Sequence, residues 1–148
     1  MTLVHRINKT KDGFNMKKIL IIGGKCQGKT KWTQENFPEY KNESAEELLK
    51  ENRQGRVKGK VWINGFHLYM KQWLRAKEDY KEKTKLLVEN PSWIIVSDEI
   101  GSGIVPMDKE EREWREETGR MLCKIAEQAD EVYRVFCGIP TMIKGSDV

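Results

Sequence analysis

The sequence has few cysteines, and the three that it has are not arranged in pairs. Cys26, Cys123 and Cys137 lie far apart, and no C-x-x-C spacing occurs among the 148 residues. An odd and scattered set of cysteines argues against a disulfide framework and against a cysteine-based zinc site. Unpaired thiols are typical of a reducing compartment, so the cysteine content predicts a cytoplasmic protein.

A long apolar run and a strong charge of one sign are also absent. No apolar run approaches the roughly 18 residues that a membrane helix requires, and the basic N-terminal stretch lacks the apolar segment of a signal peptide. The net charge is only +4, with acids and bases interleaved, which does not indicate nucleic-acid binding. We expect one domain over residues 16–148 after a flexible N-terminal extension at residues 1–15, with neither a membrane span nor a nucleic-acid partner.

What the sequence does contain is an alternation of short apolar runs with helical patterns. The predicted strands lie at residues 18–22, 60–64, 92–97 and 131–137. The predicted helices lie at residues 29–35, 45–52, 66–88 and 108–129. The polar tract between residues 40 and 60 gives no strand signal. Alternating strands and helices predict a three-layer α/β domain with a mostly parallel sheet of four or five strands.

A glycine-rich loop follows the first predicted strand. The stretch GGKCQGKT matches the pattern G-x-x-x-x-G-K-[ST], whose backbone N–H groups and helix N-terminus surround a polyphosphate. We therefore predict a P-loop NTPase-like domain that binds ATP or GTP. The predicted nucleotide-binding residues are Gly23, Gly24, Lys25, Cys26, Gln27, Gly28, Lys29 and Thr30.

Two side chains of this loop carry the predicted chemistry. Lys29 reaches the β- and γ-phosphates, and the Thr30 hydroxyl ligates Mg²⁺. The Cys26 thiol is either reactive or simply a small side chain at a position where only the backbone matters. The alternative interpretation of the whole loop is a glycine-rich turn without a ligand.

Two carboxylates stand at the end of the third predicted strand. Ligands of open α/β sheets bind at the carboxyl ends of strands, where Asp98 and Glu99 lie. Such acids hold Mg²⁺ or act as a base toward an acceptor hydroxyl, so we predict both as catalytic and Asp98 also as a metal ligand. The alternative is that they cap a turn. Gly101 and Gly103 predict a mobile or tightly turned loop after them.

The last predicted helix carries three arginines. Arginine suits bidentate contact with phosphate, and we assign Arg112 and Arg115 as candidate catalytic residues. The alternative is a solvated helix face on which pairs such as Glu111 with Arg115 balance the charge. We expect only one of Arg112, Arg115 and Arg120 to touch a ligand.

The second half of the chain resembles a known enzyme family. The segment DEIGSGIVP at residues 98–106, the R-x-W-R helix at residues 112–120 and the strand entry ADEV at residues 129–132 correspond without a gap from Trp93 to Lys144. With the strand–helix segment KVWINGFHLYMKQWL, they resemble the adenosylcobinamide kinase / adenosylcobinamide-phosphate guanylyltransferase family.

The resemblance implies a function in cobamide biosynthesis. It implies transfer of a phosphoryl group from ATP or GTP, with Mg²⁺, to a hydroxyl of adenosylcobinamide, a corrinoid acceptor. Lys29 and the loop then hold the phosphates, Thr30 with Asp98 or Glu99 positions Mg²⁺, Glu99 orients or deprotonates the acceptor, and Arg112 or Arg115 steadies the transferring charge. The family also suggests a small homo-oligomer.

Three departures from the family pattern concern its second reaction, guanylyl transfer. Family members carry a histidine that takes the guanylyl group, but residues 31–59 contain none. His67 lies beyond the strand at residues 60–64, either as a participant in the chemistry or as a helix-start residue near the site. Asn64 stands where the family has aspartate, and Asp98 where it has asparagine. The sequence thus leaves the guanylyl step open.

Two other functions also remain open. The chain could be a P-loop kinase for a different small hydroxyl compound, with the acceptor pocket rebuilt by the short segment at residues 31–59. It could instead be a non-catalytic ATP- or GTP-binding protein that regulates a partner.

Overall fold

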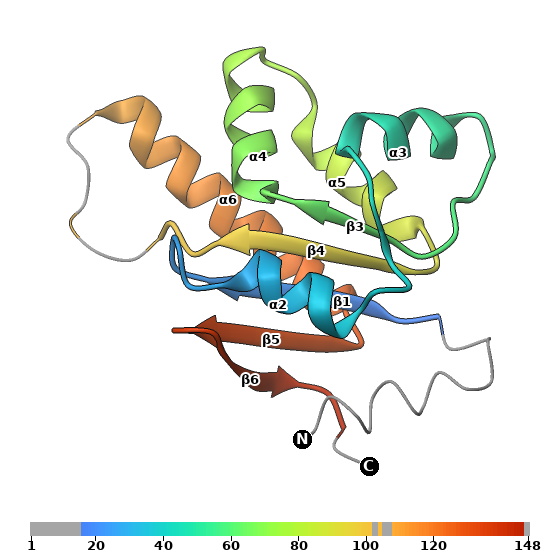
Figure 1. Cartoon of the computed structure of the whole chain (residues 1–148). Helices are drawn as coiled ribbons and strands as arrows, with labels where there is room; N and C mark the ends of the chain where they lie inside the picture. Colours follow the sequence, from blue (N-terminus) through green and yellow to red (C-terminus); the bar gives the residue numbers. More distant parts are fainter. Residues whose placement is uncertain (1–15, 102–103, 105–107, 147–148) are drawn as a thin grey trace.

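The computed structural model describes residues 16–101, 104 and 108–146 (Figure 1). The predicted N-terminal extension and Gly103 lie outside the described residues. The strands are β1 (Lys18–Gly23), β2 (Lys41–Asn42), β3 (Val61–Asn64), β4 (Trp93–Asp98), β5 (Glu131–Phe136) and β6 (Ile139–Lys144). The helices are α2 (Lys29–Asn36), α3 (Ala45–Arg53), α4 (Phe66–Arg75), α5 (Tyr80–Glu89) and α6 (Lys109–Gln128).

The sheet is mostly parallel, with the strand order β2-β3-β4-β1-β5-β6. Strands β1 to β5 pair in parallel, and β6 pairs antiparallel with β5 at one edge. The predicted α/β architecture is therefore confirmed, but the described sheet has six strands rather than four or five. Strand β2 was missed because two exposed residues carry no periodicity, and β6 because Pro140, which an edge strand tolerates, suggested a turn.

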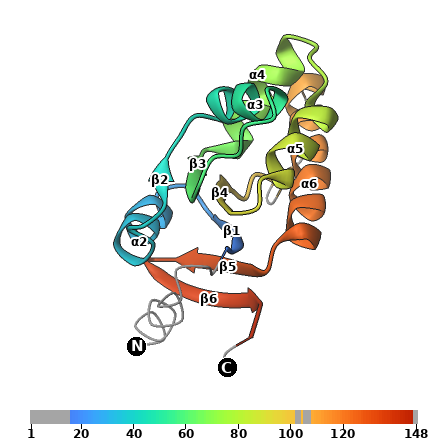
Figure 2. The same cartoon turned by 90° about the vertical axis from the view of Figure 1, so that its right-hand side faces the viewer.

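Helices cover both faces of the sheet (Figure 2). Helix α2 lies on one face, and helices α3, α4, α5 and α6 lie on the other. The alternation of side chains along β1 divides the core accordingly, because Ile19 and Ile21 pack with Trp32 of α2, whereas Leu20 packs with Trp73 of α4. Both faces of the central strands are apolar, as buried parallel strands require.

The single helix predicted at residues 66–88 is wrong, because the structure has α4 and α5 there. Helix α4 ends at Arg75, and Lys77 adopts a left-handed φ of 55°. Asp79 then caps α5 by accepting a hydrogen bond from the backbone N–H of Glu82. Both helices pack into the same core, so apolar residues recur at helical spacing on either side of the break. The sequence pattern therefore did not show where α4 ends and α5 begins.

Helix α6 follows the prediction closely. Asp108 caps it by accepting a hydrogen bond from the backbone N–H of Glu110, and Thr118, Met121 and Ile125 face the core. Of the helices in the described part of the chain, none is long and apolar enough to cross a membrane.

Candidate active site

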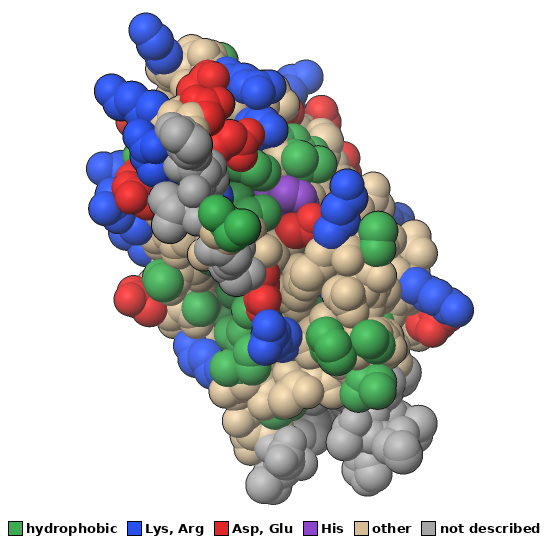
Figure 3. Space-filling view, turned by 90° about the vertical axis from the view of Figure 1, so that its left-hand side faces the viewer, with side chains coloured by type: hydrophobic (Ala, Val, Ile, Leu, Met, Phe, Trp, Pro, Cys, Tyr) green, Lys and Arg blue, Asp and Glu red, His purple; other side chains and the backbone are tan. Residues whose placement is uncertain are grey.

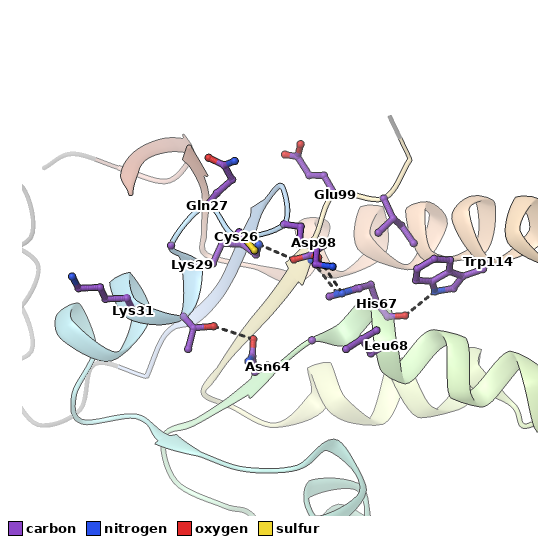
Figure 4. Close-up of a pocket in the computed structure, with 15 residues that line it drawn as sticks. Cys26, Gln27, Lys29, Lys31, Asn64, His67, Leu68, Asp98, Glu99 and Trp114 are labelled. Atoms are coloured by element: carbon purple, nitrogen blue, oxygen red, sulfur yellow. Dashed lines mark hydrogen bonds and ion pairs between the residues drawn. The ribbon is translucent and has the colours of Figure 1, made fainter. Parts of the chain in front are cut away.

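A cleft of about 870 Å³ opens at the carboxyl ends of β1, β3 and β4. The space-filling view of this side shows a histidine at the surface beside acidic and apolar side chains (Figure 3). The described residues that line the cleft are Lys25, Cys26, Gln27, Gly28, Lys29, Thr30, Lys31, Asn64, Gly65, His67, Leu68, Asp98, Glu99, Ile100 and Trp114. The sheet thus brings the glycine loop together with both predicted carboxylates (Figure 4).

The loop has the backbone shape that an anion site needs. Cys26 and Gly28 adopt left-handed φ angles of 60° and 89°, and Gly28 caps α2 without a side-chain hydrogen bond. The first N–H groups of α2 therefore point to the cleft without a capping side chain over them. Gly23 passes so close to β5 that an added Cβ would lie 2.4 Å from the carbonyl oxygen of Val135.

The turn between β5 and β6 holds the loop in place. The Gln27 side-chain oxygen accepts a hydrogen bond of 2.7 Å from the backbone N–H of Cys137. The Gln27 carbonyl accepts a second bond of 2.8 Å from the backbone N–H of Gly138. The Gln27 side chain is thereby engaged with the turn, so its predicted contribution to phosphate binding is through its backbone.

Lys29 is directed toward the predicted metal ligand. Its ammonium lies 2.7 Å from Asp98 Oδ1 and donates a bond of 2.7 Å to the carbonyl of Gly24. The residue is only 7% exposed. A buried ammonium requires such partners, because losing water without them is costly. The structure therefore joins two residues that the sequence placed in separate motifs.

His67 completes this cluster from the start of α4. Its Nδ1 accepts the backbone N–H of Asp98 at 3.1 Å, and its Nε2 lies 3.3 Å from Asp98 Oδ2. Burial lowers the pKa of His67, with a further lowering by the Lys29 charge and an opposing effect from Asp98. In this arrangement Nδ1 acts as a hydrogen-bond acceptor and carries no proton. The sequence left His67 either as a participant in the chemistry or as a helix-start residue near the site.

Oxygen atoms suitable for Mg²⁺ converge on the cleft. Thr30 Oγ1 lies 3.5 Å from Asn64 Oδ1, and the Asp98 carboxylate lines the same space. Hard oxygen donors fit Mg²⁺, which keeps several waters and phosphate oxygens in its shell. Among the described residues no group of three His, Cys, Asp or Glu side chains could hold a metal alone. The donors present therefore fit an ion that shares its ligands with a phosphate.

Glu99 lines the cleft but is paired with an arginine that sequence analysis did not consider. Its two carboxylate oxygens lie 2.9 and 3.0 Å from Nε and Nη2 of Arg134 on β5. The Glu99 backbone N–H also donates to the carbonyl of Gly23. An arginine within an apolar strand was the signal that could have identified Arg134.

Helix α6 brings Trp114 to the cleft, while the predicted arginines lie outside its described lining. Trp114 Nε1 donates a bond of 2.7 Å to the carbonyl of His67, and the Lys71 ammonium lies 4.5 Å from the indole ring. Arg115 donates to the carbonyl of Ile104 in the loop after β4. Arg112 and Arg115 remain predictions as catalytic residues.

Comparison with known proteins identifies the family of the chain. The family described as "Cobinamide kinase / cobinamide phosphate guanyltransferase" matches residues 59–143, more than half of the chain. The chain belongs to this family. The resemblance found in the sequence is thereby confirmed, and the P-loop NTPase-like fold agrees with it. The matched range begins after the glycine loop, so the assignment of residues 23–30 rests on their own sequence and geometry.

A curated relative supports the same family membership. The "Bifunctional adenosylcobalamin biosynthesis protein CobU" of Salmonella typhimurium (strain LT2) is 41% identical over 51 residues. The match covers 34% of this chain and 28% of the relative, so it spans less than a third of the relative's length.

Proposed function

We propose that this protein transfers the γ-phosphoryl group of ATP or GTP to a hydroxyl of adenosylcobinamide in the biosynthesis of adenosylcobalamin. One observation carries the proposal: a family member presents a P-loop and its lysine to a cleft that also holds two carboxylates. Phosphoryl transfer depends mainly on positioning and on electrostatic stabilisation, which this set of groups supplies.

The glycine loop forms the nucleotide half of the cleft. The amino end of α2 and the backbone N–H groups of residues 24–30 bind the phosphates. Lys29 leaves the Asp98 carboxylate and neutralises the β- and γ-phosphates instead. This exchange keeps the ammonium paired throughout, because it replaces one anionic partner by another at nearly the same place.

Thr30 and Asp98 are the proposed Mg²⁺ ligands. The ion, when bound with the nucleotide, neutralises charge on the phosphate oxygens. The Thr30 hydroxyl and the Asp98 carboxylate face the same space as Asn64, whose amide oxygen lies beside Thr30.

Apolar side chains form the acceptor half of the cleft. Leu68, Ile100 and Trp114 line it, and Leu68 is 58% exposed. An exposed apolar wall suits a large and partly apolar acceptor such as a corrinoid. Glu99 lies between the two halves, where it orients or deprotonates the acceptor hydroxyl. Arg115 donates to the carbonyl of Ile104, and Arg112 or Arg115 steadies the transferring charge.

The guanylyl step is a second candidate function, favoured by the description of the family. A cytoplasmic location and a small homo-oligomer are further proposals. Kinases for another hydroxyl compound and non-catalytic nucleotide-binding regulators are the competing hypotheses.

Transfer of label from nucleotide to acceptor tests the proposal. The protein is incubated with Mg²⁺, adenosylcobinamide and γ-labelled ATP or GTP, and the corrinoid fraction is counted. We expect label in adenosylcobinamide phosphate. Nucleotide binding without label in any corrinoid would favour a regulator, and label in another hydroxyl compound alone would favour a different kinase. A parallel incubation with α-labelled GTP reports guanylyl transfer.

A further inference from the structure

We propose that Arg134 is a positioning residue that holds the Glu99 carboxylate at the rim of the cleft through a bidentate ion pair. Arg134 lies on β5 and is not among the described residues that line the cleft, whereas Glu99 is one of them. The arginine therefore acts on the site through Glu99 and does not touch a ligand itself. The inference rests on the proposed function in one respect, the role of Glu99 toward the acceptor hydroxyl.

The alternation of side chains along the strands brings Arg134 and Glu99 to the same face of the sheet. Side chains two positions apart on a strand share a face. Val132 of β5 and Ile95 of β4 both pack in the core on the side of α6. Arg134 follows Val132 by two positions, and Glu99 follows Ile95 by four. Because β1 lies between β4 and β5, the ion pair spans the end of β1.

Both carboxylate oxygens of Glu99 contact the guanidinium group. Oε1 lies 2.9 Å from Arg134 Nε, and Oε2 accepts a hydrogen bond of 3.0 Å from Nη2. A planar fork of this kind fixes the direction of a carboxylate as well as its distance. The backbone of Glu99 is held separately, because its N–H donates to the Gly23 carbonyl at 2.9 Å. The side chain and the backbone of Glu99 are thus attached to two different strands.

The bidentate geometry makes this pair more effective than an ordinary surface ion pair. The Arg134 side chain is 57% exposed, whereas the Glu99 side chain is only 24% exposed. Most exposed ion pairs contribute little, and well-formed bidentate pairs between arginine and a carboxylate are the exception. Without the guanidinium group the Glu99 side chain would be free to change rotamer. A group that orients a substrate loses much of its effect when it is misplaced.

The ion pair also separates two carboxylates that are neighbours in the sequence. Asp98 Oδ1 lies 2.7 Å from the Lys29 ammonium, whereas the Glu99 carboxylate is directed away from this cluster and pairs with Arg134 (Figure 4). Each acid at the end of β4 therefore has its own cation. Without Arg134, the Glu99 carboxylate would be available to compete with Asp98 for the Lys29 ammonium.

A double-mutant cycle separates an action through Glu99 from an independent one. Arg134→Gln, Glu99→Gln and the double variant are compared in the label-transfer assay, and calorimetry measures the Kd of Mg–ATP. A misplaced group costs up to about 100-fold in rate. We expect Arg134→Gln to lower kcat about 10- to 100-fold, with the Kd of Mg–ATP within about twofold of wild type. The double variant should be no slower than Glu99→Gln.

The ion pair of Arg56 with Glu51 offers a matched control. The Arg56 side chain is 62% exposed and lies 2.7 Å from the carboxylate, and neither residue is among those described as lining the cleft. Arg56→Gln should therefore leave kcat at the wild-type value. Losses in kcat that multiply in the double variant would show that Arg134 acts independently of Glu99. An Arg134→Gln variant that loses Mg–ATP affinity as much as kcat would show a nucleotide contact or a packing role. Either result would overturn the inference.

Thermal unfolding measures the same ion pair without an acceptor. Each single variant breaks the pair, and the double variant breaks it only once, so coupled side chains give non-additive losses. We expect the two single-variant losses in Tm, added together, to exceed the loss in the double variant by about 2 °C or more. Additive losses would overturn the inference. A protein that shows this coupling but transfers no label to adenosylcobinamide would overturn the proposed function alone.

Discussion

Lys29 is a buried cation beside the glycine loop that we propose to bind phosphate. A buried ammonium without partners would be strongly destabilising, and here Asp98 and the Gly24 carbonyl satisfy it. The charge is thereby held near the place where the loop and α2 would receive a polyphosphate. The proposed binding of a phosphate would exchange one set of Lys29 partners for another and would not require a new charge to be buried.

The first prediction concerns the Lys29 side chain. Lys29→Ala removes the cation that would bridge the phosphates, so we expect ATP and GTP affinity or turnover to fall on the order of 100-fold or more. Titration calorimetry measures the nucleotide affinity, and the label-transfer assay measures the turnover. Lys50→Ala, which removes an exposed lysine of α3 away from the cleft, is the matched control. Wild-type binding and rates for Lys29→Ala would refute the assignment of the loop.

The second prediction concerns Glu99. Glu99→Gln keeps the size of the side chain and one acceptor oxygen but removes the charge that pairs with Arg134. Because a base acts in the transition state, we expect kcat to fall about 100-fold or more while nucleotide affinity changes little. Glu127→Gln at the exposed end of α6 is the control. Equal losses in kcat and in affinity would show a structural role.

At the scale of elements, β1, the glycine loop and α2 form one unit that is held by its neighbours. Gly23, the last residue of β1, lies close to the Val135 carbonyl of β5. The Gln27 side chain accepts a hydrogen bond from Cys137 in the turn after β5. The loop is therefore shaped by strand packing and by a hairpin from the other end of the chain, as well as by its own glycines. A pre-shaped loop loses less conformational freedom when a phosphate binds.

The third prediction tests this packing with two glycines. Gly23→Ala places a Cβ 2.4 Å from the Val135 carbonyl, so we expect the free energy of unfolding to fall by about 1–3 kcal/mol. Gly119→Ala is the matched control, because the new Cβ meets nothing within 4 Å in the middle of α6. It should raise the free energy of unfolding by up to about 1 kcal/mol. Urea unfolding measures both, and equal stability of the two variants would contradict the close approach of β1 and β5.

At the scale of the whole molecule, the strand order places the site. Strand β1 lies between β4 and β5, with α2 on one face of the sheet and α6 on the other (Figures 1 and 2). After β1 the chain turns to α2 on one face, and after the neighbouring strand β4 it turns to α6 on the other face. Such a divergence at the carboxyl ends of two neighbouring strands leaves a crevice between them. The cleft with the loop, Asp98 and His67 occupies this position.

The fourth prediction follows for the whole chain. A ligand that binds only the folded state stabilises it by about 2.7 kcal/mol at a concentration of 100 times its Kd. For a protein of this size, 1 kcal/mol shifts the melting temperature by roughly 2–4 °C. We expect Mg–ATP or Mg–GTP at that excess to raise Tm by roughly 5–10 °C, measured by scanning calorimetry, and adenosine without phosphates to have no effect. No rise with either nucleotide would exclude the nucleotide site.

The sequence by itself determined the local parts of this protein. Strands β1, β3, β4 and β5, the glycine loop and the start of α6 were predictable because apolar periodicity, glycines and capping residues act over a few neighbouring positions. The family was predictable for the same reason, since its motifs are contiguous. The break between α4 and α5 escaped this local evidence, because two helices packed on one core preserve a single period.

Only the tertiary structure decided which of these parts meet. His67 and Asp98 are 31 residues apart, Glu99 and Arg134 are 35 apart, and Gln27 and Cys137 are 110 apart. Each pair is joined because the strand order and the shared direction of the parallel strands bring their ends to one edge of the sheet. Periodicity gives the faces of each element but not the order of the strands, so a linear pattern could propose the catalytic groups without showing their partners.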